Sequence, residues 1–189
     1  TSAEFKKSKF ELATYRTDIR NVLQENSVKD LQTQEDQNFY NNIVSVATAN
    51  SNVYNISGGF TRQNMLNGVK KLIEKKLPVG CILMTQSMYT DLLGFPATDV
   101  GSSAASDLFR GQGTLDNFHG YKIITTNKSD ILPTNQAIVF APKEYLGQMY
   151  TLQDATLFLK VEADMLSFST YEAIGVGIGN VNGAAVLNF

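Results

Sequence analysis

Hydrophobic residues recur at helical spacing between residues 61 and 76. Thr61 stands before the run, where its hydroxyl suits the N-cap of a helix, and Pro78 stands after it. Lys75 and Lys76 fall in the predicted last turn, where positive charge complements the helix dipole. The apolar positions share one helical face: Met65, Val69, Leu72 and Ile73. The pattern therefore predicts an amphipathic helix with one buried face.

A longer helix is predicted over residues 27–49, but its middle, 32–38, is almost wholly polar. A largely polar helix of this length usually lies on a surface or between subunits rather than in a core. Before it, Phe10 and Leu12 alternate with polar residues, which predicts a half-buried strand over residues 10–15.

Strands dominate the rest of the pattern. Short apolar or alternating runs predict them at residues 81–84, 121–126, 136–141, 156–161, 167–174 and 184–189. A short helix is predicted at 87–93, and loops rich in Gly, Ser and Asn at 50–59 and 95–113. A helix–strand–helix centre followed by strands indicates an α+β fold, in one large domain or two small ones for 189 residues.

Composition narrows the classes of function. The net charge of −2 leaves no basic excess to neutralise phosphates, which argues against sequence-specific reading of DNA or RNA. The basic clusters, at residues 6–9 and 70–76, are interpreted as solvated. A lone Cys81 forms no internal disulfide and no multi-cysteine zinc site. No apolar run approaches the roughly 18 residues that a membrane span requires.

Catalytic motifs are incomplete. His119 lies before Gly120 and is interpreted as a turn or surface residue rather than a catalyst. The glycine-rich segment 175–179 lacks the Lys-Ser/Thr ending of a phosphate loop, so we interpret it as a strand end with tight backbone packing. Four scattered acids have no calcium-loop spacing: Asp91, Asp99, Asp107 and Asp116. We therefore predict no catalytic residue, no cofactor and no metal site.

Several segments, in order, carry a family resemblance. The helix at 65–76 leads into CILM at 81–84 and YTDLL at 89–93. The loop ending at Gly113 is followed by FHGYKII at 118–124 and AIVFAP at 137–142, with Leu146-Gly147 after them. The closing segments are YEAIGVGIGN at 171–180 and AAV at 184–186. In this order, over residues 10–189, they resemble the major capsid proteins of tailed phages, the Hong Kong ninety-seven-type shell fold.

The resemblance implies a central axial α/β domain at residues 57–142 and an elongated peripheral domain at 16–56 and 143–189. The helix at 27–49 would be the long spine helix of the peripheral domain, and residues 1–15 a remnant of the extended arm, the E-loop, that reaches a neighbour. The chain lacks an initiator Met, so we expect it to be processed or trimmed, with the rest of the arm before it. The expected inter-subunit contact residues are Phe5, Lys6, Lys7, Lys9, Phe10 and Tyr15. Some capsids of this family crosslink an arm lysine to a distant Asn, and the three lysines are candidates by position.

The implied function is structural and not enzymatic. The resemblance implies a phage or prophage subunit that assembles with itself, through hexamers and pentamers, into an icosahedral capsid around packaged DNA. It would lie in the virion capsid, and in the host cytoplasm during assembly. Scaffold and portal proteins are possible partners, contact with DNA is non-specific at most, and no membrane is involved. Two alternatives stay open: an encapsulin-type nanocompartment shell, and an unrelated α/β enzyme or ligand-binding domain near His119 and residues 95–113.

Overall fold

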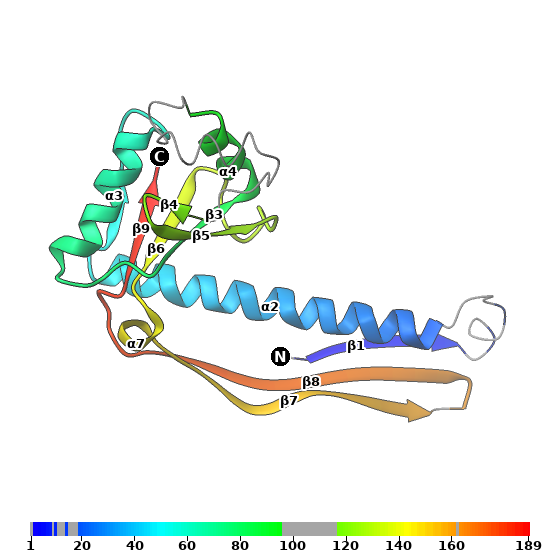
Figure 1. Cartoon of the computed structure of the whole chain (residues 1–189). Coiled ribbons are helices and arrows are strands. Elements are labelled where there is room, and N and C mark those ends of the chain that lie inside the picture. The colour runs from blue at the N-terminus through cyan, green and yellow to red at the C-terminus, as the bar shows by residue number, and fades with distance from the viewer. Residues whose placement is uncertain (1, 9, 11–13, 15–18, 96–116, 162) are drawn as a thin grey trace. The chain divides into compact units, whose positions relative to one another are not determined.

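The computed structural model describes residues 2–8, 10, 14, 19–95, 117–161 and 163–189. The chain divides into two compact units. The first is made of Thr1–Phe39 and Met149–Gly177, and the second of Tyr40–Gln148 and Ile178–Phe189. Both units contain helix and sheet (Figure 1), which confirms the α+β class.

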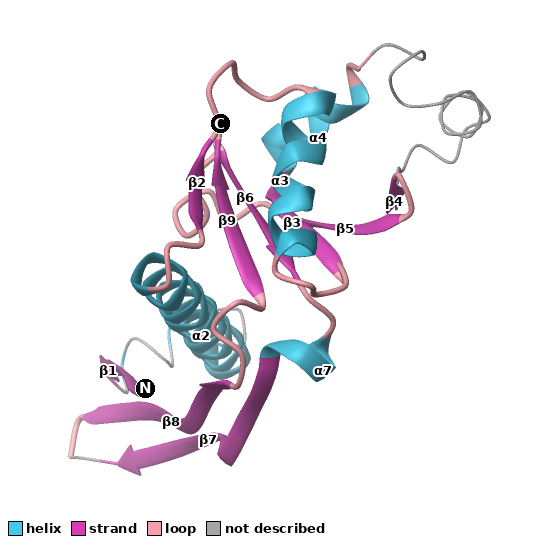
Figure 2. Ribbon diagram, turned by 90° about the vertical axis from the view of Figure 1, so that its left-hand side faces the viewer, coloured by secondary structure: helices cyan, strands magenta, loops and turns pink. Residues whose placement is uncertain are grey.

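The first unit is built on a three-stranded sheet with the order β1-β8-β7. Its strands are β1 (Ser2–Ser8), β7 (Gly147–Val161) and β8 (Met165–Ile178). The first part of α2 (Ile19–Ala49) runs along one face of this sheet in both ribbon views (Figures 1 and 2). Ser27 and Leu31 of α2 are buried, as are Leu166, Phe168 and Thr170 on alternate positions of β8. The core of this unit therefore lies between α2 and β8.

The second unit is built on a six-stranded sheet with the order β2-β9-β6-β3-β5-β4. The pairs β2–β9 and β3–β5 are parallel, and the other pairs are antiparallel. Its strands are β2 (Val53–Asn55), β3 (Cys81–Thr85), β4 (Asn117–Phe118), β5 (Tyr121–Thr126), β6 (Gln136–Phe140) and β9 (Ala184–Asn188). β6 is central and buried at every position, which explains its nearly continuous apolar run.

The described part of the second unit also contains the later part of α2 and the helices α3 (Arg62–Glu74), α4 (Gln86–Leu93) and α7 (Lys143–Leu146). The Thr61 hydroxyl caps α3 by accepting the backbone N–H of Asn64 at 3.2 Å, as the sequence predicted. The apolar faces of α3 and α4 join the sheet in one core, together with residues such as Met65, Leu92 and Leu187.

Several predicted elements are confirmed and extended. The helix expected at 27–49 begins earlier, at Ile19, and the strands expected at 156–161 and 167–174 are parts of the longer β7 and β8. β2 lies inside the segment predicted as a loop at 50–59, and β4 and α7 were not predicted. The predicted loop at 95–113 lies outside the described residues apart from Phe95.

The prediction of a strand at residues 10–15 is wrong at Phe10 and Thr14, the two residues of this segment that the structure describes. Phe10 and Thr14 are helical, and the Thr14 hydroxyl donates to the Phe10 carbonyl at 3.0 Å. Such a bond four residues back competes with extended structure. The terminal strand lies earlier, at β1, where it pairs antiparallel with β8. The other residues of the predicted strand lie outside the described part of the chain.

The division into axial and peripheral domains stays a prediction. The chain passes from one compact unit to the other after residues 39, 148 and 177, whereas the predicted domain boundaries follow residues 56 and 142. β9, which that division grouped with the peripheral residues, is hydrogen-bonded between β2 and β6.

Candidate subunit-contact surface

The predicted contact residues lie around β1, at one edge of the three-stranded sheet. The backbone of Phe5 is paired with Phe168 of β8, and Lys6 and Lys7 follow on the same strand. Lys6 is exposed and Lys7 is half-buried, while the helical Phe10 is 78% exposed. The other two candidates, Lys9 and Tyr15, lie outside the described residues. The structure therefore brings Phe5, Lys6 and Lys7 together on one edge strand, and their role in contacts stays a prediction.

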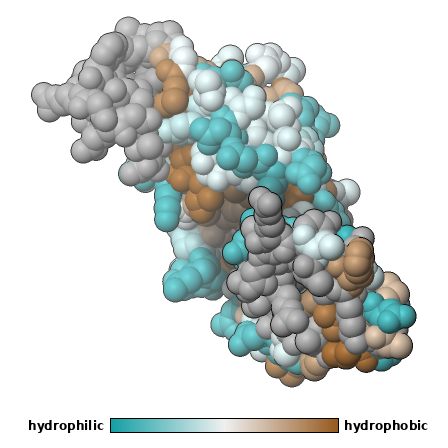
Figure 3. Space-filling view, turned by 90° about the vertical axis from the view of Figure 1, so that its right-hand side faces the viewer, coloured by the Kyte–Doolittle hydropathy of each residue, from teal (hydrophilic) through white to brown (hydrophobic). Residues whose placement is uncertain are grey.

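A second candidate surface, on β7, was not singled out by the sequence pattern. β7 is the opposite edge of the same sheet, so among the described strands one side of its backbone has no partner. Tyr150, Leu152 and Phe158 are 62%, 90% and 53% exposed, and their even spacing puts them on one face of the strand. Figure 3 shows hydrophobic atoms at the surface around the end of the β7–β8 hairpin. We call these three residues the β7 row.

A free strand edge with large exposed apolar side chains is typical of a surface that pairs with another chain. Alternation of apolar and polar residues at 150–154 was the available signal in the sequence. That signal identifies a strand but not its position at the edge of a sheet, because the order of strands depends on residues far apart in the chain.

Two carboxyl groups meet between α2 and β8 in the first unit. Glu35 is hydrogen-bonded to Glu172, and among the described residues its Oε1 is enclosed without a partner of its own. Burial raises the pKa of Glu35, and the hydrogen bond and negative charge of Glu172, with the charge of Asp36, raise this pKa further. The protonated form of Glu35 is therefore favoured beside Glu172, so the contact is sensitive to pH.

A hydrogen-bonded network crosses one end of the six-stranded sheet. The Tyr40 hydroxyl donates to Oε1 of Gln136 at 2.7 Å, and Nε2 of Gln136 donates to Oδ1 of Asn188 at 2.9 Å. Nδ2 of Asn188 then donates to Oδ1 of Asn55 at 2.8 Å. Burial raises the pKa of Tyr40, although its bond to Gln136 acts in the opposite direction. The network joins the later part of α2 to β6, β9 and β2.

The segments considered for catalysis have structural explanations. His119 and Gly120 have φ angles of 49° and 87°, as a two-residue hairpin turn between β4 and β5 requires, which confirms the predicted turn. Nε of Arg62 donates to Nε2 of His119 at 3.1 Å. Burial raises the pKa of the Cys81 thiol, which the charge of Lys122 partly offsets.

The glycine-rich segment 175–179 spans the end of β8, as predicted, but the expected tight packing is absent at Gly175, where a Cβ would meet open space. The described residues hold no group of three or more His, Cys, Asp or Glu side chains that could bind a metal. None of their helices is both long enough and apolar enough to span a membrane.

No protein-family model and no curated protein matches the chain. Solved structures do match it over its whole length. One from Mycobacterium phage Che8 has a TM-score of 0.78 at 16% identity, and one from Microbacterium phage Oxtober96 has 0.80 at 13%. The capsid structure of the cyanophage P-SCSP1u has a TM-score of 0.70 at 12% identity. Each match covers 100% of this chain, and 70%, 71% and 71% of the respective matched chains. The chain therefore has the fold of phage major capsid proteins, the Hong Kong ninety-seven-type shell fold that its sequence resembles.

Proposed function

We propose that this chain is a structural subunit of a phage or prophage capsid, which self-assembles into an icosahedral shell around packaged DNA. The observation that carries the proposal is the match of the whole chain to the capsid fold. The role is mechanical rather than enzymatic, with the virion capsid as its location and the host cytoplasm as its place of assembly.

The proposed subunit has an axial domain centred on the six-stranded sheet and a peripheral domain carrying the spine helix α2. The two compact units support this division, with β9 assigned to the axial domain because it lies inside that sheet. In this proposal the residues around β1 belong to the extended arm, with Lys6, Lys7 and Lys9 as candidate crosslinking residues.

The β7 row is the proposed route to self-association. Full burial of a large apolar side chain contributes roughly 1.5–3 kcal/mol, and all three side chains of the row are more than half exposed. The backbone edge of β7 that pairs with none of the described strands adds hydrogen-bonding groups for an incoming strand of another copy. Burial of this row in a shell would account for its exposure in the single chain.

Sedimentation velocity of the protein expressed from its full coding sequence tests the proposal. We expect large assemblies, and we expect the double substitution Leu152→Gln with Phe158→Gln to shift the protein toward small species. The matched control is Thr156→Gln, which lies on the same exposed face of β7 and replaces no apolar side chain. Circular dichroism would confirm that all variants remain folded. A wild-type protein that stays monomeric at high concentration counts against the proposal.

The two alternatives make different predictions. An encapsulin-type shell shares the fold, and its gene would neighbour a cargo enzyme such as a peroxidase or a ferritin-like protein. A capsid gene would instead neighbour portal and terminase genes. An enzyme centred on His119 would require that His119→Ala abolish a measurable activity, whereas a turn residue affects stability alone.

A further inference from the structure

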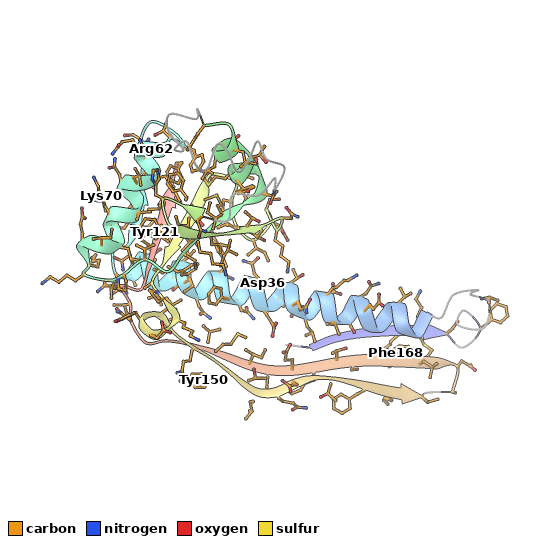
Figure 4. All side chains as sticks on the ribbon, viewed as in Figure 1. Asp36, Arg62, Lys70, Tyr121, Tyr150 and Phe168 are labelled. Atoms are coloured by element: carbon orange, nitrogen blue, oxygen red, sulfur yellow. The ribbon has the colours of Figure 1, made fainter. Side chains whose placement is uncertain are left out.

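Four lysines gather at the C-terminal end of α3 in the second unit. Lys71 lies 3.3 Å from Glu74 and 5.6 Å from the ring centre of Tyr54. Lys70, Lys75 and Lys76 are exposed, and among the described residues none of the three has an ion-pair partner. Figure 4 shows Lys70 on the outer side of α3. We call Lys70, Lys75 and Lys76 the α3 lysine cluster.

The unit that carries this cluster is positive, although the whole chain has a net charge of −2. Over its residue ranges the second unit holds nine Lys or Arg against seven Asp or Glu. The first unit holds seven Lys or Arg against eleven Asp or Glu. The near-neutral total therefore conceals a separation of charge, and the α3 cluster is the densest run of positive charge in the second unit.

The backbone at Lys76 gives an independent reason to consider the cluster functional. Lys76 has a φ of 62°, and its N–H donates to the Ile73 carbonyl at 2.8 Å where the chain leaves α3. Glycine is the favoured residue at this helix-ending position, because a Cβ makes the left-handed conformation costly. A lysine at this position costs stability relative to glycine, and a strained backbone position of this kind supports a hypothesis of function.

We propose that the α3 lysine cluster binds the phosphate backbone of duplex nucleic acid without reading its sequence. Lysine side chains are flexible point charges that suit phosphates. At a rise of about 1.5 Å per residue, the helix from Lys70 to its last residue, Glu74, is roughly 6 Å long, and Lys75 and Lys76 follow directly at its end. A duplex carries one charge per roughly 1.7 Å of its axis, so several phosphates come within reach of the cluster.

Duplex nucleic acid is preferred to an acidic protein surface as the partner because the cluster offers only cations. Of the two large apolar side chains within residues 70–76, Leu72 is buried and Ile73 is 48% exposed, so the segment lacks the group of exposed apolar side chains that makes the centre of a protein interface. The proposal rests on the proposed function for its biological partner, the DNA inside the shell.

The test measures binding of the protein, as purified from its full coding sequence, to a fluorescent DNA duplex of mixed sequence between 50 and 200 mM salt. The triple substitution of Lys70, Lys75 and Lys76 by Gln is expected to weaken binding and to reduce the slope of log K against log salt by about 0.9 per lost phosphate contact. The control substitutes Gln for three other lysines of the same unit: Lys122, Lys128 and Lys143.

Both triple variants lose the same net charge, so a difference in their DNA binding can arise only from a local binding site. An equal loss of slope in the two variants would overturn the proposal and leave a general effect of net charge. Absence of salt-dependent binding by the wild-type protein would overturn it as well.

The single substitution Lys76→Gly gives a second readout. Glycine relieves the left-handed strain, so the urea midpoint is expected to rise while DNA binding weakens. Mere damage to the fold would lower both quantities, and unchanged binding would contradict the proposal.

The same samples, viewed by electron microscopy, separate this inference from the proposed function. If the triple variant loses DNA binding but still forms intact shells, the result supports both the lysine site and the capsid role. DNA binding that depends on the cluster in a protein that never forms shells supports the lysine site and refutes the capsid role.

Discussion

Replacing Gly68 with Ala tests how closely α3 packs on the six-stranded sheet. A Cβ at Gly68 would collide with Cδ1 of Leu187 on β9 and would lie 3.0 Å from its Cδ2. Carbon atoms attract best at about 3.5–4.0 Å, and Leu187 is fully buried, so its side chain can shift only within the packed core. Overpacking of this kind costs typically 1–3 kcal/mol. The gain in helix propensity from Gly to Ala returns about 1 kcal/mol. We therefore expect Gly68→Ala to lower the free energy of unfolding by about 1 kcal/mol.

The assay is urea unfolding of the dispersed subunit, followed by far-ultraviolet circular dichroism. Leu187→Ala alone should cost about 2–5 kcal/mol, because it leaves a cavity in the core. In that background the obstacle is gone, so adding Gly68→Ala should raise stability by up to about 1 kcal/mol. The sign of the Gly68→Ala effect thus reverses between the two backgrounds. A stabilising effect of similar size in the wild-type background would refute the proposed packing.

Three further predictions concern single polar contacts. The raised pKa of Glu35 means that the folded state favours the protonated carboxyl. The stability gained from protonated Glu35 is therefore present below the unfolded pKa of about 4.5, and it is lost as the pH rises through the higher pKa of the folded state. Glu35→Gln should therefore raise the urea midpoint at pH 7 and flatten its pH dependence, and a lower midpoint at pH 7 would contradict the contact. Thr61→Ala should cost about 1 kcal/mol of unfolding free energy through loss of the α3 cap, whereas Thr61→Ser should retain most of it. Tyr40→Phe should cost about 1 kcal/mol or more, because it leaves the Gln136 oxygen without its donor, and a neutral result in the same urea titration would remove Tyr40 from the network.

Elements with strong local signals were predictable from the sequence. The helix α3 has a cap, a helical apolar period and a stop signal within one short segment, and β6 is a run of apolar residues because it is buried on both faces. These features depend on neighbours in the chain, and the structure reproduces them closely.

Elements defined by distant partners were not predictable in the same way. β2 is three residues within an Asn- and Ser-rich segment, and its pairing with β9 makes it a strand. The strand at residues 10–15 was misplaced because two alternating apolar residues are too short a signal against local helical bonding. The β7 row was missed as a surface because its exposure follows from the order of strands in the sheet. The α3 cluster was visible as a charge run, but the left-handed backbone at Lys76 is known only from the structure.

Electron microscopy of the protein expressed from its full coding sequence tests the central claim most directly. The proposed capsid role predicts closed shells of uniform size, in which image averaging resolves rings of five and six subunits with the two units seen here in each subunit. A population of isolated, folded monomers at high protein concentration, with no rings or shells, would contradict it.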